Sequence, residues 1–277
     1  MNGKNTSYDP VTAADEAYAT GSTAEIFADI RATMGIPLLT SIWRGLADMD
    51  DALPKVWSIA KPLYLSGGPE RALERVIERV DLPKPEPLTR TQLACVGMTA
   101  SSLAAAKTVI AAYNRSNGMN MVAFPALSAA LGKGAAFSEA RMPMPDWSTF
   151  PALLPRDQIS PDVWAMIERV NTFGSAGPGA FVATLWRHLA HWPELLALAH
   201  AGFAPLGKSD AIKAATVQMA EVARDEGERM ANPRWRLEGV SDDVRSVVVD
   251  YAAKPTHVAR MVTMGHALAR WLDASVD

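Results

Sequence analysis

Apolar residues recur at helical spacing along most of the chain, with polar residues between them. Ser22 stands three residues before Glu25. This is the arrangement of a capping box, in which two side chains satisfy backbone N–H groups at a helix start. The apolar residues that follow share one face of that helix: Ile26, Ile30 and Met34. The pattern therefore predicts a helix that opens at Ser22.

The same spacing predicts helices further along the chain. Ser160 followed by Pro161 is typical of a helix start, because proline has no N–H to leave unsatisfied at the first helical position. Another helix is expected over 209–230, and a last one over about 257–272. Extended alternation of β-branched and aromatic residues is almost absent. The chain is therefore predicted to be all-α.

The order of the helical segments repeats. Four segments of the first half resemble four segments of the second, at offsets of 137 to 143 residues: 25–35 with 162–174, 42–47 with 185–190, 62–63 with 205–206, and 107–113 with 245–251. These ordered matches predict two pseudo-symmetric repeats in one compact molecule, although amphipathic helices also resemble one another by chance. A site for a small molecule is expected at the interface between the repeats.

The predicted organisation has four parts: an N-terminal tail (1–21), a first helical repeat (22–140), a Pro-rich linker (141–160) and a second helical repeat (161–277). The linker holds four prolines, at positions 143, 145, 151 and 155. Each proline removes a helix donor and restricts the residue before it. The linker is therefore expected to be extended.

Composition and charge exclude several classes of protein. Of 277 residues, 49% are apolar and 21% are charged, a balance typical of a globular protein with a proper core. The 27 basic and 30 acidic residues leave a formal net charge of -3, so no nucleic acid partner is expected. The tail lacks the apolar stretch of a secretory signal, and no window resembles a membrane span. We expect a cytoplasmic protein that does not contact membranes.

Cysteine and histidine give weak signals. Cys95 is the single cysteine, which excludes an intramolecular disulfide and a Cys-based zinc cluster. Its apolar neighbours favour a buried, inert thiol. His188 and His191 stand three residues apart and could share a metal, but no carboxylate lies at matching spacing, so no metal and no cofactor are predicted. Six tryptophans are interpreted as core residues: Trp43, Trp57, Trp186, Trp192, Trp235 and Trp271.

The most unusual polar segment is 113–120, which falls between two strongly apolar helical stretches. Asn114 and Asn117 carry amides that compete with the backbone for hydrogen bonds inside a helix. One interpretation is a helix end followed by a new helix start. The other is an amide that orients a water molecule or a small acid, because an amide both donates and accepts hydrogen bonds.

The whole chain resembles the group I 2-haloacid dehalogenases, which are duplicated all-helical enzymes that act on D- or both enantiomers of 2-haloacids. The resemblance covers roughly residues 22–275 and rests on motifs in a fixed order: Ile36-Pro37 followed by Trp43-Arg44-Gly-Leu-Ala, Leu53-Pro-Lys-Val-Trp57, Tyr113-Asn-Arg-Ser-Asn117, and Leu189-Ala-His-Trp192-Pro193.

The resemblance implies hydrolysis of a carbon–halogen bond by direct attack of water. In this family a buried Asp activates the water, an Asn positions it, and helix N-terminal amides with small polar side chains hold the carboxylate. The Asn matches Asn117. Ser66 and Glu70 match a Thr–Glu pair that is important in some members. The remaining pocket residues match Leu38, Ser41, Thr184 and Tyr251.

The catalytic Asp does not carry over, because Leu185 stands at its position and a leucine cannot accept a proton. A substitute base is one way to replace it. His188 follows Leu185 by three residues on the same helical face, and neutral imidazole accepts a proton. Asp250 and Glu70 are further candidates. The proline that often follows the Asn is Gly118 here, which we expect to loosen a turn at that point.

Without a substitute base, either the pocket now serves another reaction, or catalysis is lost and a small ligand is bound. We expect a hydrolase that removes halide from a small 2-halocarboxylic acid. The alternative is a homologue that binds or transforms another small carboxylic acid. Arg44 and Arg187 occupy equivalent repeat positions, where each is either a structural ion-pair residue or a contact for an anionic substrate. The Met and Leu stripes fit a homodimer as well as an inter-repeat core.

Overall fold

The computed structural model describes residues 16–129, 140–174, 182–253 and 255–275. These residues form twelve α-helices and four short 3-10 helices, and they contain no strand. The predicted all-α class is therefore confirmed for the described part of the chain. No helix within these ranges is long and apolar enough to cross a membrane.

Most of the helices follow one another with short connections, but the Pro-rich segment separates the sixth α-helix from the seventh. The α-helices before the Pro-rich segment are α1 (Gly21–Met34), α2 (Ser41–Ala47), α3 (Ala52–Leu65), α4 (Gly68–Arg79), α5 (Arg90–Cys95) and α6 (Ala100–Ser128). Those after it are α7 (Pro161–Val170), α8 (Thr184–His188), α9 (Pro193–Lys208), α10 (Ala211–Met230), α11 (Asp242–Ala253) and α12 (Pro255–Ala274). The 3-10 helices are Glu16–Tyr18, Arg156–Gln158, Leu189–His191 and Pro233–Trp235.

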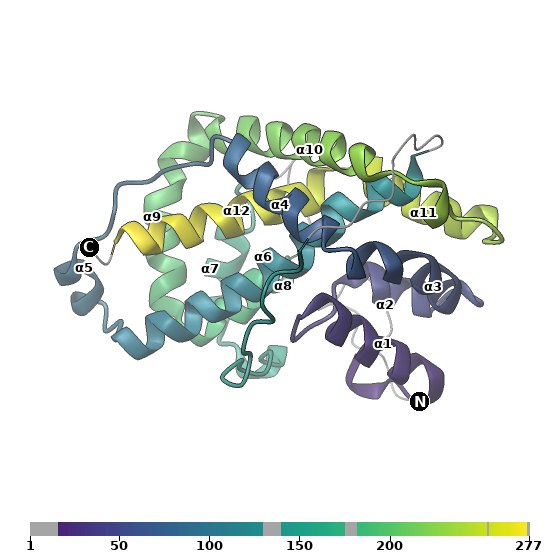
Figure 1. Ribbon diagram of the computed structural model, residues 1–277. Coiled ribbons are helices and arrows are strands. Elements are labelled where there is room, and N and C mark those ends of the chain that lie inside the picture. Colours follow the sequence, from purple (N-terminus) through teal and green to yellow (C-terminus); the bar gives the residue numbers. More distant parts are fainter. Residues whose placement is uncertain (1–15, 130–139, 175–181, 254, 276–277) are drawn as a thin grey trace.

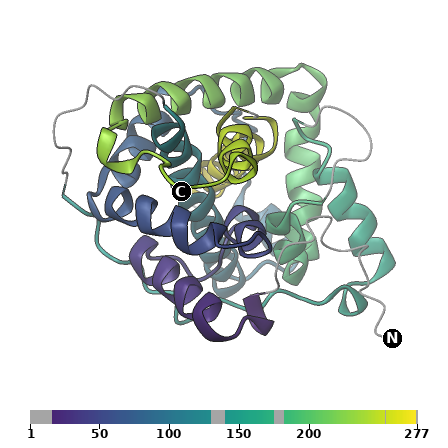
Figure 2. The same ribbon diagram turned by 90° about the vertical axis from the view of Figure 1, so that its right-hand side faces the viewer.

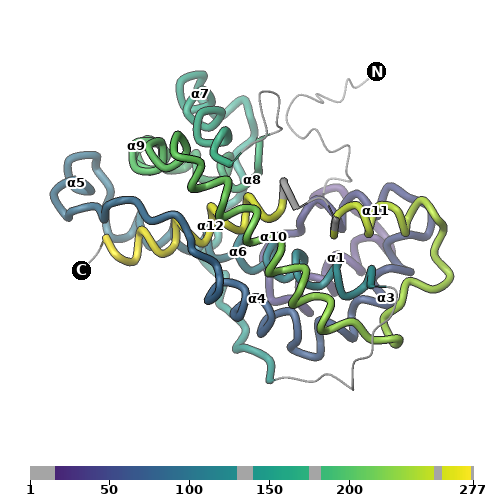
Figure 3. The backbone as a smooth tube through the Cα atoms, turned by 90° about the horizontal axis from the view of Figure 1, so that it is seen from above, coloured from purple at the N-terminus to yellow at the C-terminus, as the bar shows by residue number. Residues whose placement is uncertain are grey.

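The long helices α6 and α12 run side by side through the middle of the molecule, and α10 packs against both (Figure 1). Figure 2 views α12 nearly along its axis, with other helices around it. Helices α1 to α3 gather at one end, whereas α5 and the C-terminal end of α12 lie at the other (Figure 3). Hydrogen bonds join the segment before α5 to the C-terminal end of α12 and the residue after it, since Trp271 donates to the Glu86 carbonyl at 2.8 Å and Leu88 N donates to the Ser275 hydroxyl at 2.8 Å.

Similar helix pairings occur in the two halves of the chain. Helix α1 packs on α3, and α7 packs on α9; α4 packs on α6, and α10 packs on α12. Figure 3 shows α7, α8 and α9 grouped on one side of the central helices. The first two pairings agree with the predicted duplication, whereas in the last one α12 stands where the match of 107–113 with 245–251 would place α11. The equivalence of the halves and the predicted domain boundaries stay predictions.

The core is continuous across the described residues and contains all six tryptophans that the sequence pattern assigned to it. Trp43 and Trp186 are fully buried, and they belong to the short helices α2 and α8, one in each half of the chain. A buried carboxylate also ties the halves together. Glu226 on α10 accepts hydrogen bonds from Arg75 and Arg79 on α4, each at 2.8 Å.

The predicted break near 113–120 is wrong, because α6 continues through the whole segment without interruption. Tertiary contacts outweigh the poor helix propensity of asparagine and glycine here. Gly118 does not loosen a turn. It lies inside the helix, where a Cβ would stand 2.6 Å from a methyl carbon of Leu73, so the missing side chain allows α4 and α6 to approach closely.

Local start signals predict one helix start correctly and another wrongly. The Ser160 hydroxyl accepts from Val163 N at 3.3 Å, and Pro161 is the first residue of α7, as predicted. Ser22 is not a cap, since α1 begins at Gly21, whose φ of 56° is open to glycine at little cost. The linker predicted over 141–160 is free of helix up to residue 155, but the expectation that all of it is extended is wrong, because a 3-10 helix spans Arg156–Gln158.

The expectation of a buried thiol is also wrong. Cys95 is exposed at the end of α5, a six-residue helix that buries only Leu93. A helix this short presents one narrow apolar face, so its remaining apolar residues face solvent.

Candidate functional site

A buried hydrogen bond joins α6 to α8. The Tyr113 hydroxyl lies 3.2 Å from Nδ1 of His188, and Nε2 of the same ring lies 2.9 Å from the carbonyl oxygen of Pro151. A carbonyl only accepts, so Nε2 carries the proton and Nδ1 accepts from the tyrosine hydroxyl. Burial lowers the pKa of His188 to about 4, so the ring is neutral at neutral pH.

The surroundings of His188 are apolar and aromatic. The Phe150 ring stands edge-on to it, with 4.9 Å between ring centroids. His191 lies nearby, with 5.9 Å between the ring centroids, and its Nε2 contacts the Ala152 carbonyl oxygen at 2.8 Å. The two histidines therefore hold the segment that precedes α7. No group of three metal-ligating side chains occurs in the part of the chain that the structure describes.

Asn117 stands one helical turn beyond Tyr113 on α6, and residues four apart share one face of a helix. Its side chain is half-buried, and its amide makes no hydrogen bond to any residue that the structure describes. The amide is therefore available to a water molecule or a ligand on the side of α6 that carries the Tyr113–His188 pair.

Sequence reasoning overlooked Asn120, which is completely buried. Its amide nitrogen donates to the Thr40 hydroxyl at 2.7 Å, and its oxygen accepts from the Tyr64 hydroxyl at 2.6 Å and from Trp43 Nε1 at 3.3 Å. Asn120 thus ties α6 to α2 and α3. The available signal was an amide next to the long apolar run 121–127.

Tyr251, on α11, leans against the first half of the chain. Its ring lies 4.6 Å from that of Phe124 on α6, and its hydroxyl is buried without a hydrogen-bond partner among the described residues. Burial raises the pKa of Tyr251, and burial together with Tyr251 raises the pKa of Tyr64 well above its ordinary value. The two phenols are therefore close, neutral and enclosed.

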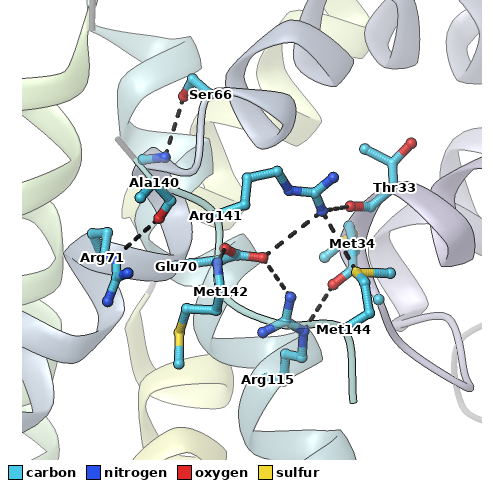
Figure 4. A network of polar contacts seen from close by, with 12 residues as sticks. Thr33, Met34, Ser66, Glu70, Arg71, Arg115, Ala140, Arg141, Met142 and Met144 are labelled. Carbon is cyan, nitrogen blue, oxygen red and sulfur yellow. Dashed lines mark hydrogen bonds and ion pairs between the residues drawn. The ribbon is translucent and has the colours of Figure 1, made fainter. Parts of the chain in front are cut away.

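Glu70 is the centre of a separate polar network (Figure 4). Its fully buried carboxylate forms an ion pair with Arg115 of α6 and lies 3.8 Å from Arg141. It also accepts from the backbone N of Met142 at 2.7 Å. Arg115 in turn donates to the Met34 carbonyl at 2.8 Å, so the network joins α1, α4, α6 and the segment after residue 139. A buried carboxylate with these partners is typical of a residue that stabilises helix packing.

The other predicted pocket residues of the first half are spread over several elements. Ser66 follows α3, where its hydroxyl donates to the Leu63 carbonyl at 2.6 Å and accepts from Gly68 N at 3.2 Å. Leu38 lies before α2 and Ser41 is the first residue of α2, and both are half-buried.

In the second half, Thr184, Leu185 and His188 lie on the same short helix, α8. Leu185 is 1% exposed and belongs to the core, whereas Thr184 is half-buried. Helix α8 also packs against α6. The structure therefore gathers these residues on the helix that meets Tyr113, and the same helix face of α6 carries Asn117.

No hydrogen bond or ion pair within the described ranges joins Glu70 to His188 or to Tyr251. The predicted residues thus fall into a group around α8 and α6, a network around Glu70, and the phenol cluster at Tyr251. Arg187, a predicted candidate for anion contact, donates from Nε and Nη2 to the Leu154 carbonyl, each at 3.3 Å.

Comparison with known proteins gives a match through structure. No protein-family model matches the chain, and no curated protein matches it in sequence. A solved structure of a D-2-haloacid dehalogenase mutant in complex with D-2-CPA superposes with a TM-score of 0.69, at 14% identity, over 95% of both chains. A second mutant structure of a D-2-halacid dehalogenase gives 0.69 at 15% identity, over 92% of this chain and 95% of the other.

A third structure, of a D-2-haloacid dehalogenase with L-LA, gives a TM-score of 0.67 at 16% identity, over 92% of this chain and 95% of the other. The three superpositions establish the architecture. Sequence identities of 14 to 16% do not establish the activity, because one fold hosts many activities. Over 92 to 95% of its length, the chain has the fold of the D-2-haloacid dehalogenase structures.

Proposed function

We propose that this chain is a hydrolase that removes halide from a small 2-halocarboxylic acid with water as the nucleophile. The fold supports the substrate class, because the matching structures are of D-2-haloacid dehalogenases. The single observation that carries the chemistry is the Tyr113–His188 hydrogen bond, one helical turn from the available amide of Asn117. No cofactor and no metal ion take part in this proposal.

The proposed step uses His188 as the proton acceptor through Tyr113. Asn117 holds a water molecule beside the Tyr113 oxygen. As the water oxygen attacks carbon 2 of the acid, its proton passes to the Tyr113 oxygen, and the tyrosine proton passes to Nδ1 of His188. The carbon–halogen bond breaks and the halide leaves with the bonding electrons. The products are a 2-hydroxy acid, halide and a protonated His188.

The protonation state of His188 suits this role. Burial lowers its pKa to about 4, so the ring is neutral at neutral pH and its Nδ1 can accept a proton, which Leu185 cannot do. A positioned base contributes about 10²- to 10⁴-fold to rate. Histidine one turn along α8 would therefore restore the basicity that Leu185 lacks.

The test is halide release by the purified protein from D- and L-2-chloropropionate and the bromo analogues. His188→Gln and Tyr113→Phe should each lower kcat by about 10²-fold or more while the protein stays folded. His191→Gln is the matched control, because His191 makes the same kind of carbonyl contact beside His188 and has no contact with Tyr113. Equal loss of activity in all three variants would contradict the proposal.

A second candidate function is binding of a small carboxylic acid without hydrolysis. Two observations favour it: Leu185 is part of the apolar core, and both ring nitrogens of His188 already have hydrogen-bond partners within the protein. Leu185→Asp separates the two functions. If the wild type is silent and Leu185→Asp releases halide, the pocket persists and its hydrolytic chemistry has been given up.

A further inference from the structure

Arg260 on α12 is a buried cation that no acid neutralises within the described residues. The side chain is 2% exposed. Its guanidinium donates to the carbonyl oxygen of Asn171 and lies 3.5 Å from Oδ1 of the same residue, and both of these oxygens are neutral. No carboxylate lies within 4.0 Å of the Arg260 guanidinium among the residues that the structure describes.

The other buried charges of this protein are handled differently. Glu226 pairs with Arg75 and Arg79, and Glu70 pairs with Arg115. A guanidinium does not release its proton in a protein, so the charge of Arg260 cannot be avoided by deprotonation. Burying an unpaired ion is costly. A buried arginine whose partners among the described residues are neutral is therefore suited to a ligand that brings the missing negative charge.

The position of Arg260 relates it to the proposed site. Oδ1 of Asn171, which Arg260 contacts, also accepts from Ala183 N at 3.1 Å, and Ala183 directly precedes α8. From Ala183 to His188 a helix rises about 7.5 Å. The Asn171 residue that Arg260 contacts and the Tyr113 residue that contacts His188 therefore meet opposite ends of α8.

Helix α12 also packs directly against α6. Gly265, five residues beyond Arg260, lies so close to Asn114 of α6 that a Cβ would overlap the amide oxygen. Asn114 is the neighbour of Tyr113. Gly174 leaves room for the stem of Arg260, since a Cβ there would stand 3.2 Å from Cγ of Arg260. The contacts with Asn171 position the guanidinium before any ligand arrives.

We propose that Arg260 is the carboxylate anchor of this protein, binding the acid group of a small carboxylic acid through two parallel N–H···O hydrogen bonds. The inference rests on the proposed function for the class of ligand. Planar guanidinium matches planar carboxylate in this way, and the resulting charge-assisted bonds are roughly twice as strong as neutral ones. The anchored acid would point its carbon 2 towards the Tyr113–His188 pair.

The experiment measures binding of propionate, which carries no leaving group, by isothermal titration and by the shift in Tm. Propionamide is the neutral probe of the same shape, and inorganic phosphate is the second anion. Wild type should bind propionate and raise its Tm, and propionamide should do neither. Arg260→Gln should weaken propionate binding by about tenfold or more. Arg270→Gln, on an exposed position of the same helix, should bind as wild type does.

Stability separates an anchor from a structural residue. Without ligand, Arg260→Gln should have a Tm equal to or above that of wild type, because it removes a buried unpaired charge. If Arg260→Gln does not fold, that prediction is overturned, and Arg260→Lys decides the binding role. Lysine keeps the charge and loses the two-point geometry, so it should fold and bind propionate more weakly. Equal propionate affinity in wild type and Arg260→Lys would overturn the anchor.

The outcomes distinguish this inference from the proposed function. If Arg260→Gln binds propionate as tightly as wild type while wild type releases halide, the anchor is overturned and the proposed function stands. If propionate binding depends on Arg260 and wild type releases no halide, the anchor stands and the proposed function fails. Binding of phosphate without binding of propionate would overturn the assignment to a carboxylate.

Discussion

The hydroxyl of Tyr113 and Nδ1 of His188 stand 3.2 Å apart, although 75 residues separate them in the chain. The first residue belongs to the predicted first repeat and the second to the predicted second repeat. Their hydrogen bond crosses the interface at which the sequence pattern predicts a site. Together with the contact between Nε2 and the Pro151 carbonyl oxygen, this hydrogen bond fixes the orientation of the His188 imidazole.

Buried histidines should make this protein less stable in acid. The pKa of His188 and that of His266 are both lowered to about 4 by burial, against an ordinary value of 6.5. Between these values the unfolded chain binds more protons than the folded one, so the free energy of unfolding rises with pH. The stability that depends on these two neutral histidines is fully present above about pH 6.5 and is lost as the pH falls towards 4. Urea denaturation of wild type and His188→Gln at pH 7.5, 5.5 and 4.5 measures it. The variant should show the smaller pH dependence, and an identical dependence in both proteins would refute the assignment to His188.

Alanine substitutions of two asparagines three residues apart should have different effects, one on stability and the other on activity. Asn120→Ala removes hydrogen bonds to Thr40, Trp43 and Tyr64 from the core and should lower the free energy of unfolding by about 3 kcal/mol. Asn117→Ala loses no hydrogen bond within the described residues and should change stability by less than about 0.5 kcal/mol. Its effect should appear in halide release instead. Denaturant titration and halide assays on both variants check this, and a large stability loss in Asn117→Ala would argue for a structural role.

The Glu70 network should stabilise the folded protein and take no part in catalysis. Glu70→Gln leaves Arg115 buried without its counter-ion, a change that typically costs about 3 to 5 kcal/mol. Glu74→Gln is the matched control, because its pair with Arg71 is more exposed and should contribute less than about 1 kcal/mol. Chemical denaturation compares them. A fully stable Glu70→Gln with no catalytic activity would instead make Glu70 part of the reaction.

Glycine substitutions test the close approach of α4 and α6. Gly118→Ala would push a Cβ to 2.6 Å from a Leu73 methyl carbon, and overpacking of this kind costs about 1 to 3 kcal/mol. Gly45→Ala, inside α2, would meet nothing within 4 Å and should stabilise the protein by roughly 0.5 to 1 kcal/mol through helix propensity. Thermal denaturation should move the two Tm values in opposite directions, and a shared direction would contradict the packing argument.

Much of the local structure was predictable from short-range patterns. The helical class, the Ser160 cap, the non-helical segment 140–155 and the buried tryptophans each depend on neighbours within a few positions or on the apolar nature of one side chain. Local patterns also had limits. The capping box that forms is at Thr89 and Gln92, whereas the same spacing at Ser22 and Glu25 forms none.

The sequence by itself determined that the chain would form amphipathic helices, and its resemblance to the 2-haloacid dehalogenases led to the prediction that Leu185 stands where that family has its acid. Only the tertiary structure decided which polar groups meet. It showed α6 to be unbroken, Asn120 to be saturated and Asn117 to be available. Among the described residues it also left Arg260 without a buried acid beside it. The physical reason is range: a helix is set by residues three and four apart, whereas the partner of a buried charge or amide comes from any helix that packs beside it.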